Sequence, residues 1–213
     1  MGRRALRKVD PALDLSRLFR EAADLAAAFE QAALFERAAP LEVEVGSGKG
    51  LFLAQASADC LERNFLGIEI ARKYARYAAA PLAKQQSENA VVICGDALAL
   101  FQRWFTGASL AAVHVYFPDP WWKKRHKKRR VMSGQFLRDV ERTLVIGGRL
   151  HFWTDVEEYF QTTLALIKAT VSLAGPLEVA EQPAEHDLDY RTHFERRTRK
   201  SALPVYRAEF EKR

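Results

Sequence analysis

The stretch from Leu41 to Gly50, LEVEVGSGKG, decides the fold expected for this chain of 213 residues. Its first five residues alternate apolar and acidic side chains, which is typical of a β-strand with one buried face. A glycine-rich turn follows and leads directly into the apolar residues LFLA at 51–54. A strand, a tight turn and a helix start in this order predict the first part of a βαβ unit.

Strand and helix patterns go on alternating after this unit. Further strands are expected at residues 64–70, 90–94, 110–117 and 149–153. Helices are expected at residues 71–84, from 96 through 104, at 133–145 and at 156–171. This alternation predicts an α/β fold with a doubly wound, mostly parallel sheet and helices on both of its faces.

The two ends of the chain depart from this pattern. Residues 1–12 are predicted to be a flexible basic arm, and helical spacing of apolar residues predicts an N-terminal amphipathic helix at 14–37. Residues 177–182 and 203–210, on either side of a long polar loop, predict a C-terminal antiparallel strand pair. Because there is no repeat or low-complexity linker, we expect residues 1–213 to form a single domain.

Composition narrows the class of protein. A hydrophobic fraction of 48% with 28% charged residues is typical of a globular domain. The net charge of +6 favours an anionic partner. The two cysteines, Cys60 and Cys94, and the five histidines have no metal-ligand spacing, so no metal is expected. Without a membrane-length apolar run or a signal-peptide pattern, a cytoplasmic protein with no membrane partner is expected.

Acidic residues recur at the ends of the expected strands. Glu44 lies in the first strand, and Glu69, Asp96 and Asp119 lie at the ends of the next three. The carboxyl ends of parallel strands share one edge of a sheet, where α/β proteins bind their ligands. Four acids on one edge therefore predict a single extended ligand.

The glycine turn indicates which ligand this is. GSGKG completes neither a phosphate-binding GxxxxGK[ST] loop nor a dinucleotide-binding GxGxxG pattern. Glu69 is placed to accept both hydroxyls of a ribose, Asp96 to accept from an adenine amine, and Glu44 to lie beside a cationic group. These features describe S-adenosylmethionine. Helix capping remains the alternative for Glu69 and Asp96, and a solvent-facing strand position or a helix-dipole partner remains the alternative for Glu44.

Residues 114–130, HVYFPDPWWKKRHKKRR, join an acid to a dense group of cations. Pro118 and Pro120 bracket Asp119 and end the strand. Seven of the eight residues at 123–130 are Lys or Arg, a density suited to a phosphate backbone. A solvated charged face is the alternative. The two tryptophans allow a core position, a lid or a face on which a base stacks.

Together the segments LEVEVGSGKG, FLGIEI, GDA, YFPDPWWKKRHKKRR, WTD and THFERR resemble the bacterial tRNA (guanine-N7)-methyltransferases over residues 40–213. The resemblance implies a Rossmann-like class I methyltransferase. It also implies S-adenosylmethionine as the cofactor, tRNA as the partner, and formation of 7-methylguanine in the tRNA variable loop. The chain departs from the usual family pattern at Trp122, where proline is common, and at Ala202, where glycine is usual. Whether it acts as a monomer or a homodimer is left open.

The resemblance also implies roles for individual residues. Those for the donor are Glu44, Gly46, Gly48, Glu69, Asp96 and Asp119, of which Asp119 is also the catalytic candidate. Those for the substrate are Lys123, Asp155, Thr192, His193, Phe194 and Glu195. Those in contact with RNA are Arg125, His126, Lys127, Lys128, Arg129 and Arg130. For Thr192 and Glu195, three residues apart, the spacing alone allows a helix-capping pair equally well.

Guanine N7 has a free lone pair and no proton, so its methylation needs no general base. We expect the chain to act by positioning and electrostatics, with Asp119 and Asp155 accepting hydrogen bonds from the base. Three rival hypotheses are a small-molecule methyltransferase, a non-catalytic RNA-binding protein and a nicotinamide dehydrogenase. The basic block at residues 123–130 argues against a small-molecule methyltransferase. The four acids argue against a non-catalytic RNA-binding protein, and the incomplete glycine pattern argues against a dehydrogenase.

Overall fold

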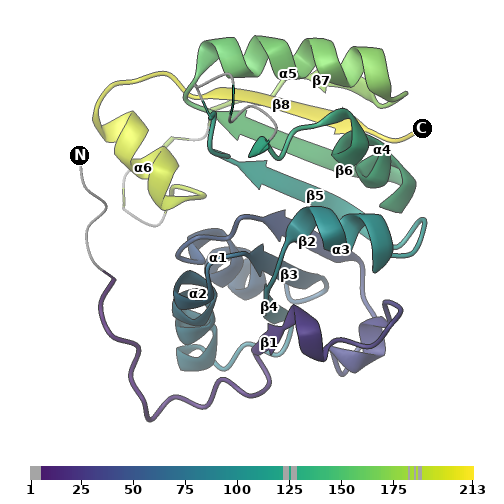
Figure 1. Ribbon diagram of the computed structural model, residues 1–213. Helices are drawn as coiled ribbons and strands as arrows, with labels where there is room; N and C mark the ends of the chain where they lie inside the picture. The colour runs from purple at the N-terminus through teal and green to yellow at the C-terminus, as the bar shows by residue number, and fades with distance from the viewer. Residues whose placement is uncertain (1–5, 122–124, 126–128, 182, 185, 187–188) are drawn as a thin grey trace.

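The computed structural model describes residues 6–121, 125, 129–181, 183–184, 186 and 189–213. These residues form an eight-stranded sheet in the order β1-β4-β3-β2-β5-β6-β8-β7, with helices packed on both sides (Figure 1). The strands are β1 (Phe19–Glu21), β2 (Leu41–Val45), β3 (Asn64–Glu69), β4 (Ala90–Cys94), β5 (Leu110–Tyr116), β6 (Leu144–Thr154), β7 (Ala174–Leu177) and β8 (Tyr206–Glu211). The α-helices are α1 (Leu51–Asp59), α2 (Arg72–Lys84), α3 (Ala97–Arg103), α4 (Gly134–Thr143), α5 (Glu157–Thr170) and α6 (His193–Lys200).

The sheet is mostly parallel, as the sequence predicted. Strands β1 to β6 pair in parallel, while β8 is antiparallel to both β6 and β7. The doubly wound α/β fold with a C-terminal antiparallel pair is therefore confirmed.

The alternation in β2 sorts side chains onto the two faces of the sheet. Val43 and Val45 belong to the apolar cluster that includes buried residues of α3, α4 and α5. Helices α1 and α2 contribute to a second cluster on the opposite face. Glu42 and Glu44 alternate with the two valines and so point toward this second face. Strand β2 thus contributes apolar side chains to the core on one face of the sheet and polar side chains on the other face.

The position of β2 in the sheet determines where a ligand can bind. It pairs with β3 on one side and with β5 on the other, so the order of the strands reverses there. In an open α/β sheet, the crevice outside the carboxyl ends of the strands at this switch point is the usual ligand site.

The N-terminal helix predicted at 14–37 is wrong. In its place the chain forms β1 and two short 3₁₀ helices, η1 (Ala22–Asp24) and η2 (Gln31–Ala33). β1 pairs in parallel with β4, and the Val92 N–H donates to the Leu18 carbonyl over 2.8 Å. Pairing with the open edge of β4 overrode the helix propensity of the alanine-rich sequence, because an edge strand presents unpaired backbone groups.

The tail differs from its prediction in detail. The strand expected at 177–182 lies earlier, as β7, and the long polar stretch before β8 contains the helix α6. The described residues include no helix that is long and apolar enough to cross a membrane.

Candidate active site at the carboxyl ends of the strands

Glu44 is the buried acid of the switch point. Its side chain lies near the end of β2 and the residue is 3% exposed. Its Oε2 atom has no hydrogen-bond partner among the described residues. Burial raises the pKa of Glu44 to about 8; the Ser47 side chain opposes this effect in part, and the nearby Glu69 carboxylate adds a smaller contribution that raises the pKa. A buried carboxyl with an unsatisfied oxygen is costly, so a cation or a hydrogen-bond donor would stabilise it here.

The glycine turn after β2 leaves its backbone open. Gly46, Gly48 and Gly50 all have positive φ angles, of 81°, 55° and 74°. A β-carbon on Gly46 would have no heavy atom within 4 Å, whereas one on Gly50 would lie 2.7 Å from the Ala78 β-carbon. Gly50 therefore allows α1 to approach α2, and Gly46 leaves room for a ligand against the backbone.

Glu69 holds the turn to the next strand. Its Oε2 accepts the Gly48 N–H over 2.9 Å, and its Oε1 accepts the Ala71 N–H over 2.9 Å. Each oxygen of a carboxylate can accept a second hydrogen bond. Glu69 is thus fixed in place while it keeps the capacity to accept the two hydroxyls of a ribose.

Asp96 caps a helix, which is one of the two alternatives that the sequence left open for it. It is the N-cap of α3, and its Oδ1 accepts the Leu98 N–H over 2.9 Å. The residue is exposed just after β4, on the same edge of the sheet as Glu69. Capping and ligand binding by its two oxygens are compatible, so its donor-binding role stays a prediction.

The loop after β5 holds Asp119 in a fixed turn. Phe117 and Trp121, on either side of Asp119, have positive φ angles of 50° and 44°, a conformation that is uncommon outside glycine. The Arg130 Nε donates to the Pro120 carbonyl over 2.6 Å. Asp119 itself is exposed. Uncommon backbone angles held by surrounding contacts are typical of functional loops.

The basic block divides into parts with different surroundings. The Arg130 guanidinium lies 4.6 Å from the centroid of the Tyr159 ring, so this residue also serves to fix the loop. Arg129 lies over the Trp121 ring at 5.2 Å, and Arg125 is exposed. Four of the predicted site residues lie outside the described residues: Lys123, predicted for the substrate, and His126, Lys127 and Lys128, predicted to contact RNA.

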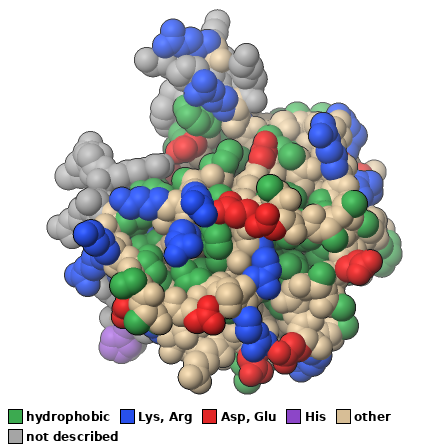
Figure 2. Space-filling view, turned by 60° about the horizontal axis from the view of Figure 1, so that its bottom comes forward, with side chains coloured by type: hydrophobic (Ala, Val, Ile, Leu, Met, Phe, Trp, Pro, Cys, Tyr) green, Lys and Arg blue, Asp and Glu red, His purple; other side chains and the backbone are tan. Residues whose placement is uncertain are grey.

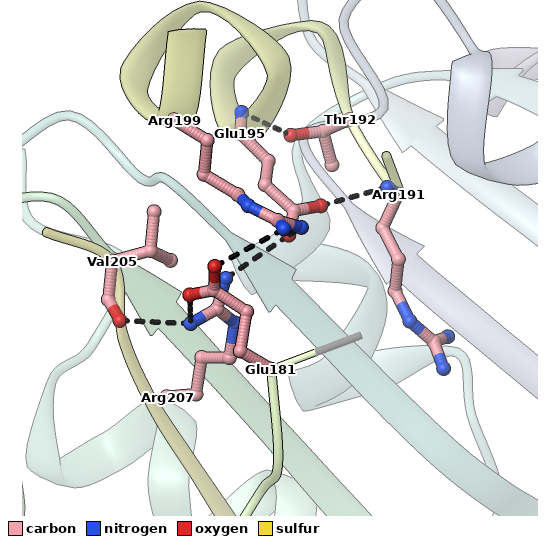
Figure 3. Close-up of polar contacts among 7 residues, drawn as sticks. All are labelled: Glu181, Arg191, Thr192, Glu195, Arg199, Val205 and Arg207. Atoms are coloured by element: carbon pink, nitrogen blue, oxygen red, sulfur yellow. Dashed lines mark hydrogen bonds and ion pairs between the residues drawn. The ribbon is translucent and has the colours of Figure 1, made fainter. Parts of the chain in front are cut away.

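The predicted substrate residues of the tail lie at the start of α6. The Thr192 Oγ1 accepts the Glu195 N–H over 3.0 Å, so the pair caps the helix (Figure 3). Glu195 is 3% exposed, and its Oε2 accepts the Arg191 N–H over 2.7 Å. The capping alternative is therefore present in the structure, and the substrate roles of both residues stay predictions.

A partly buried ionic network attaches α6 to the sheet (Figure 3). Arg207 of β8 pairs with Glu195 over 3.1 Å and with Glu181 over 3.0 Å. Arg199 pairs with the same two carboxylates over 3.4 Å and 3.1 Å. The spacing of Glu195 and Arg199, four residues apart on a helix, is a local signal for their pairing, whereas no such signal exists for Arg207, which comes from a strand.

Helix α6 lies close to two of the loops already described. The guanidinium of Arg191, just before α6, lies 5.9 Å from the centroid of the Phe52 ring, which follows the glycine turn. Burial lowers the pKa of His193, and the positive charges of Arg196 and Lys49 lower it further. The Phe194 ring stacks on the Phe117 ring, with centroids 6.1 Å apart and planes 19° apart. The structure therefore brings the tail to the turn after β2 and to the loop after β5. Asp155 is exposed just after β6 on the same edge.

A second polar layer lies behind the site and was not predicted. The two ring nitrogens of His114 contact the Glu42 Oε2 at 2.7 Å and the Tyr116 hydroxyl at 2.9 Å. The His151 ring stacks on His114 with centroids 4.5 Å apart, and its Nδ1 lies 3.0 Å from Glu209. This layer holds polar strand residues in register beneath the switch point.

The strand order, the glycine turn and the acids around the switch point together define a Rossmann-like class I methyltransferase. The fold is similar to that of the 30S ribosomal A1408 methyltransferase from an uncultured bacterium, with a TM-score of 0.54 and 14% identity over 86% of this chain and 92% of that one. It is also similar to that of the SAM-dependent O-methyltransferase from Thermotoga maritima, with a TM-score of 0.53 and 16% identity over 85% of this chain and 63% of that one.

Sequence comparison narrows this class to one family. A family model described as "Putative methyltransferase" matches residues 38–208. The tRNA (guanine-N(7)-)-methyltransferase of Rhodopirellula baltica is 52% identical over 100% of this chain and 81% of its own length. The enzyme of the same name from Alcanivorax borkumensis is 36% identical over 84% of this chain and 75% of its own length. The chain belongs to the tRNA (guanine-N(7)-)-methyltransferase family, which confirms the resemblance found in the sequence.

Proposed function

We propose that this chain transfers a methyl group from S-adenosylmethionine to N7 of a guanine in the variable loop of tRNA. The observation that carries the proposal is the buried Glu44 at the switch point, with one carboxylate oxygen unsatisfied, in a chain that is 52% identical to a tRNA (guanine-N(7)-)-methyltransferase. A cationic nucleoside satisfies this oxygen, and the family supplies the nature of the acceptor.

The residues at the carboxyl ends of β2 to β5 fit such a donor. When bound, S-adenosylmethionine supplies a methyl group that its sulfonium makes reactive. Glu44 would pair with the cationic end, and the open backbone at Gly46 and Gly48 would accommodate the donor. Glu69 would accept from the ribose hydroxyls and Asp96 from the adenine amine. Asp119 would lie beside the reacting end.

For the acceptor, the chain has to align the base, because N7 needs no deprotonation. Asp119 and Asp155 would accept hydrogen bonds from guanine N1–H and from its amino group. Asp119→Asn should lower kcat, measured at saturating donor, about 100-fold, because positioned charges act mainly in the transition state. Asp59→Asn, an exposed acid at the end of α1, serves as the control. Full turnover of the Asp119 variant would refute this assignment.

The basic block would bind tRNA phosphates. Figure 2 shows several Lys and Arg side chains at the left of one face of the molecule, with others at its top, its right edge and its bottom. Arg125→Gln should weaken tRNA binding and reduce the slope of log affinity against log salt by about 1. Lys168→Gln in α5 should leave the slope unchanged. An unchanged slope in the Arg125 variant would remove this residue from the interface.

The direct test of the function is to incubate the protein with methyl-labelled donor and bulk tRNA, digest the RNA and identify the labelled base. We expect the label on 7-methylguanine, and a tRNA with a single substituted guanine in the variable loop should not be labelled. Label on another base or on a small molecule, or no incorporation at all, would contradict the proposal.

A further inference from the structure

Helix α6 has two different faces. Its inner face carries Glu195 and Thr198, which are 3% and 2% exposed, and Arg199, which pairs with Glu195. Its outer face carries Phe194 and Arg197, both exposed. The network of Figure 3 fixes the inner face to β8, so the outer face is held in a constant orientation. Phe194 is therefore a large aromatic side chain of which a substantial part stays exposed to solvent.

The exposed ring belongs to a short stack. Phe194 is 41% exposed, and one part of its ring stacks on the buried Phe117. The Arg197 guanidinium lies 4.7 Å from the centroid of the Phe194 ring. Phe117 is itself fixed, because its N–H donates to the Trp153 carbonyl over 2.8 Å. A rigid aromatic ring beside a guanidinium is the combination that proteins use to stack an unpaired base.

The location of the stack connects it with the candidate active site. Phe117 comes two residues before Asp119, and the guanidinium of Arg191, just before α6, lies 5.9 Å from the centroid of the Phe52 ring, which follows the glycine turn. The Arg197 guanidinium supplies positive charge beside the exposed ring. A nucleotide at this position would be adjacent to the base that is methylated.

We infer that the outer face of α6 binds an unpaired nucleotide of tRNA that directly flanks the methylated guanine. The base of this nucleotide stacks on Phe194, and Arg197 pairs with its phosphate. Recognition of RNA loops commonly works through unstacked bases that lie on aromatic side chains or guanidinium planes. The inference rests on the proposed function, and it adds a second nucleotide subsite to it.

A binding experiment separates stacking from simple apolar contact. Phe194→Leu removes the π face and keeps an apolar side chain, whereas Phe194→Trp enlarges the π face. We expect the leucine variant to bind tRNA about tenfold more weakly, and the tryptophan variant to bind within about twofold of the wild type. Leu61→Ala is the matched control, because Leu61 is 67% exposed and follows α1 at the opposite edge of the sheet.

A spectroscopic experiment tests the flanking position itself. Two tRNAs carry the fluorescent base 2-aminopurine immediately 5′ or 3′ of the target guanine. We expect the wild type to quench one of them on binding through stacking, and Phe194→Leu to abolish this quenching at saturating protein. Arg197→Gln should weaken binding and its salt dependence, in contrast to Arg138→Gln on α4, which is exposed on another helix.

The outcomes distinguish the inference from the function. If the wild type forms 7-methylguanine and Phe194→Leu matches it in tRNA affinity and in 2-aminopurine fluorescence, the inference is overturned and the function stands. If the wild type forms no 7-methylguanine in tRNA, the proposed function fails and the inference fails with it. Thermal unfolding and donor affinity should be unchanged in Phe194→Leu, and a large change in either would point to a structural role and overturn the stacking subsite.

Discussion

The two faces of the central sheet are built from the same strands and differ in what they bury. The face under α3, α4 and α5 is almost entirely apolar, with Val43, Val113 and Phe152 at its centre. The face under α1 and α2 carries buried titratable groups on the same strands, including Glu44 and His114 at 3% and 2% exposure. The difference shows that burial on the first face stabilises the fold, whereas the polar groups buried on the second face, at the switch point, reduce this stability.

The largest effect on stability is expected from the apolar face. Phe136 of α4 is 2% exposed, and its ring lies 5.1 Å from that of Phe101. Phe136→Ala should lower the free energy of unfolding by about 3–5 kcal/mol through lost burial and a cavity. Phe136→Leu, as the control, should lose far less, and donor affinity measured on folded protein should not change. A fall in donor affinity would show that the apolar face also contributes to donor binding, and would contradict the division of roles between the two faces.

An effect of opposite sign is expected at Glu44. Native Glu44 keeps its proton up to about pH 8, whereas the unfolded carboxyl loses it near 4.5. Between these values the native state binds more protons, so stability falls as the pH rises. Glu44→Gln should therefore be more stable than the wild type at pH 8.5 by roughly 2–4 kcal/mol, and nearly equal to it at pH 4.5. Urea unfolding at both pH values measures this, with the exposed Glu88→Gln as a control. Equal stability at pH 8.5 would contradict the assigned burial cost.

A smaller effect is expected at His114. Burial lowers its pKa to about 4, and the neighbouring His151 adds to this against the opposing effect of Glu42; Arg191 also disfavours the charged form. The unfolded state binds a proton near pH 6.5 while the native imidazole stays neutral, so stability is present above pH 6.5 and is lost as the pH falls toward 4. His114→Asn should flatten this loss by roughly 1–2 kcal/mol. An unchanged dependence of unfolding free energy on pH would show that His114 does not titrate in this window.

Most of the sheet was predictable because its strands carry their own pattern. LEVEV at β2 and the apolar run of β4 indicated strands, and the alternation of strands with helices indicated a mostly parallel sheet. The segment at 14–37 was not, because its apolar residues have helical spacing and only the open edge of β4 makes a strand there more favourable. Helix α6 was missed because its sequence HFERRTRK is polar, and its burial depends on Arg207 and Glu181, which are distant in the chain.

The candidate site was also predictable only in part. Acids at the strand ends could be located from the sequence, since parallel strands place them on one edge. The sequence did not show that Glu69 binds the glycine turn through Oε2 and the Ala71 N–H through Oε1, or that Arg130 binds the Pro120 carbonyl. Nor did it show the layer of His114, His151 and Glu42, because such contacts depend on the register between strands.

The most direct test of the account is the number of protons exchanged when the donor binds. If Glu44 is protonated in the free protein and charged when it faces the cationic end of S-adenosylmethionine, binding at pH 7 should release close to one proton. Calorimetric titration at pH 7 in two buffers of different ionisation enthalpy measures this number. The account predicts a binding heat that depends on the buffer and corresponds to this release. A heat that is the same in both buffers would contradict the claim that a buried, neutral carboxyl at the switch point receives the donor.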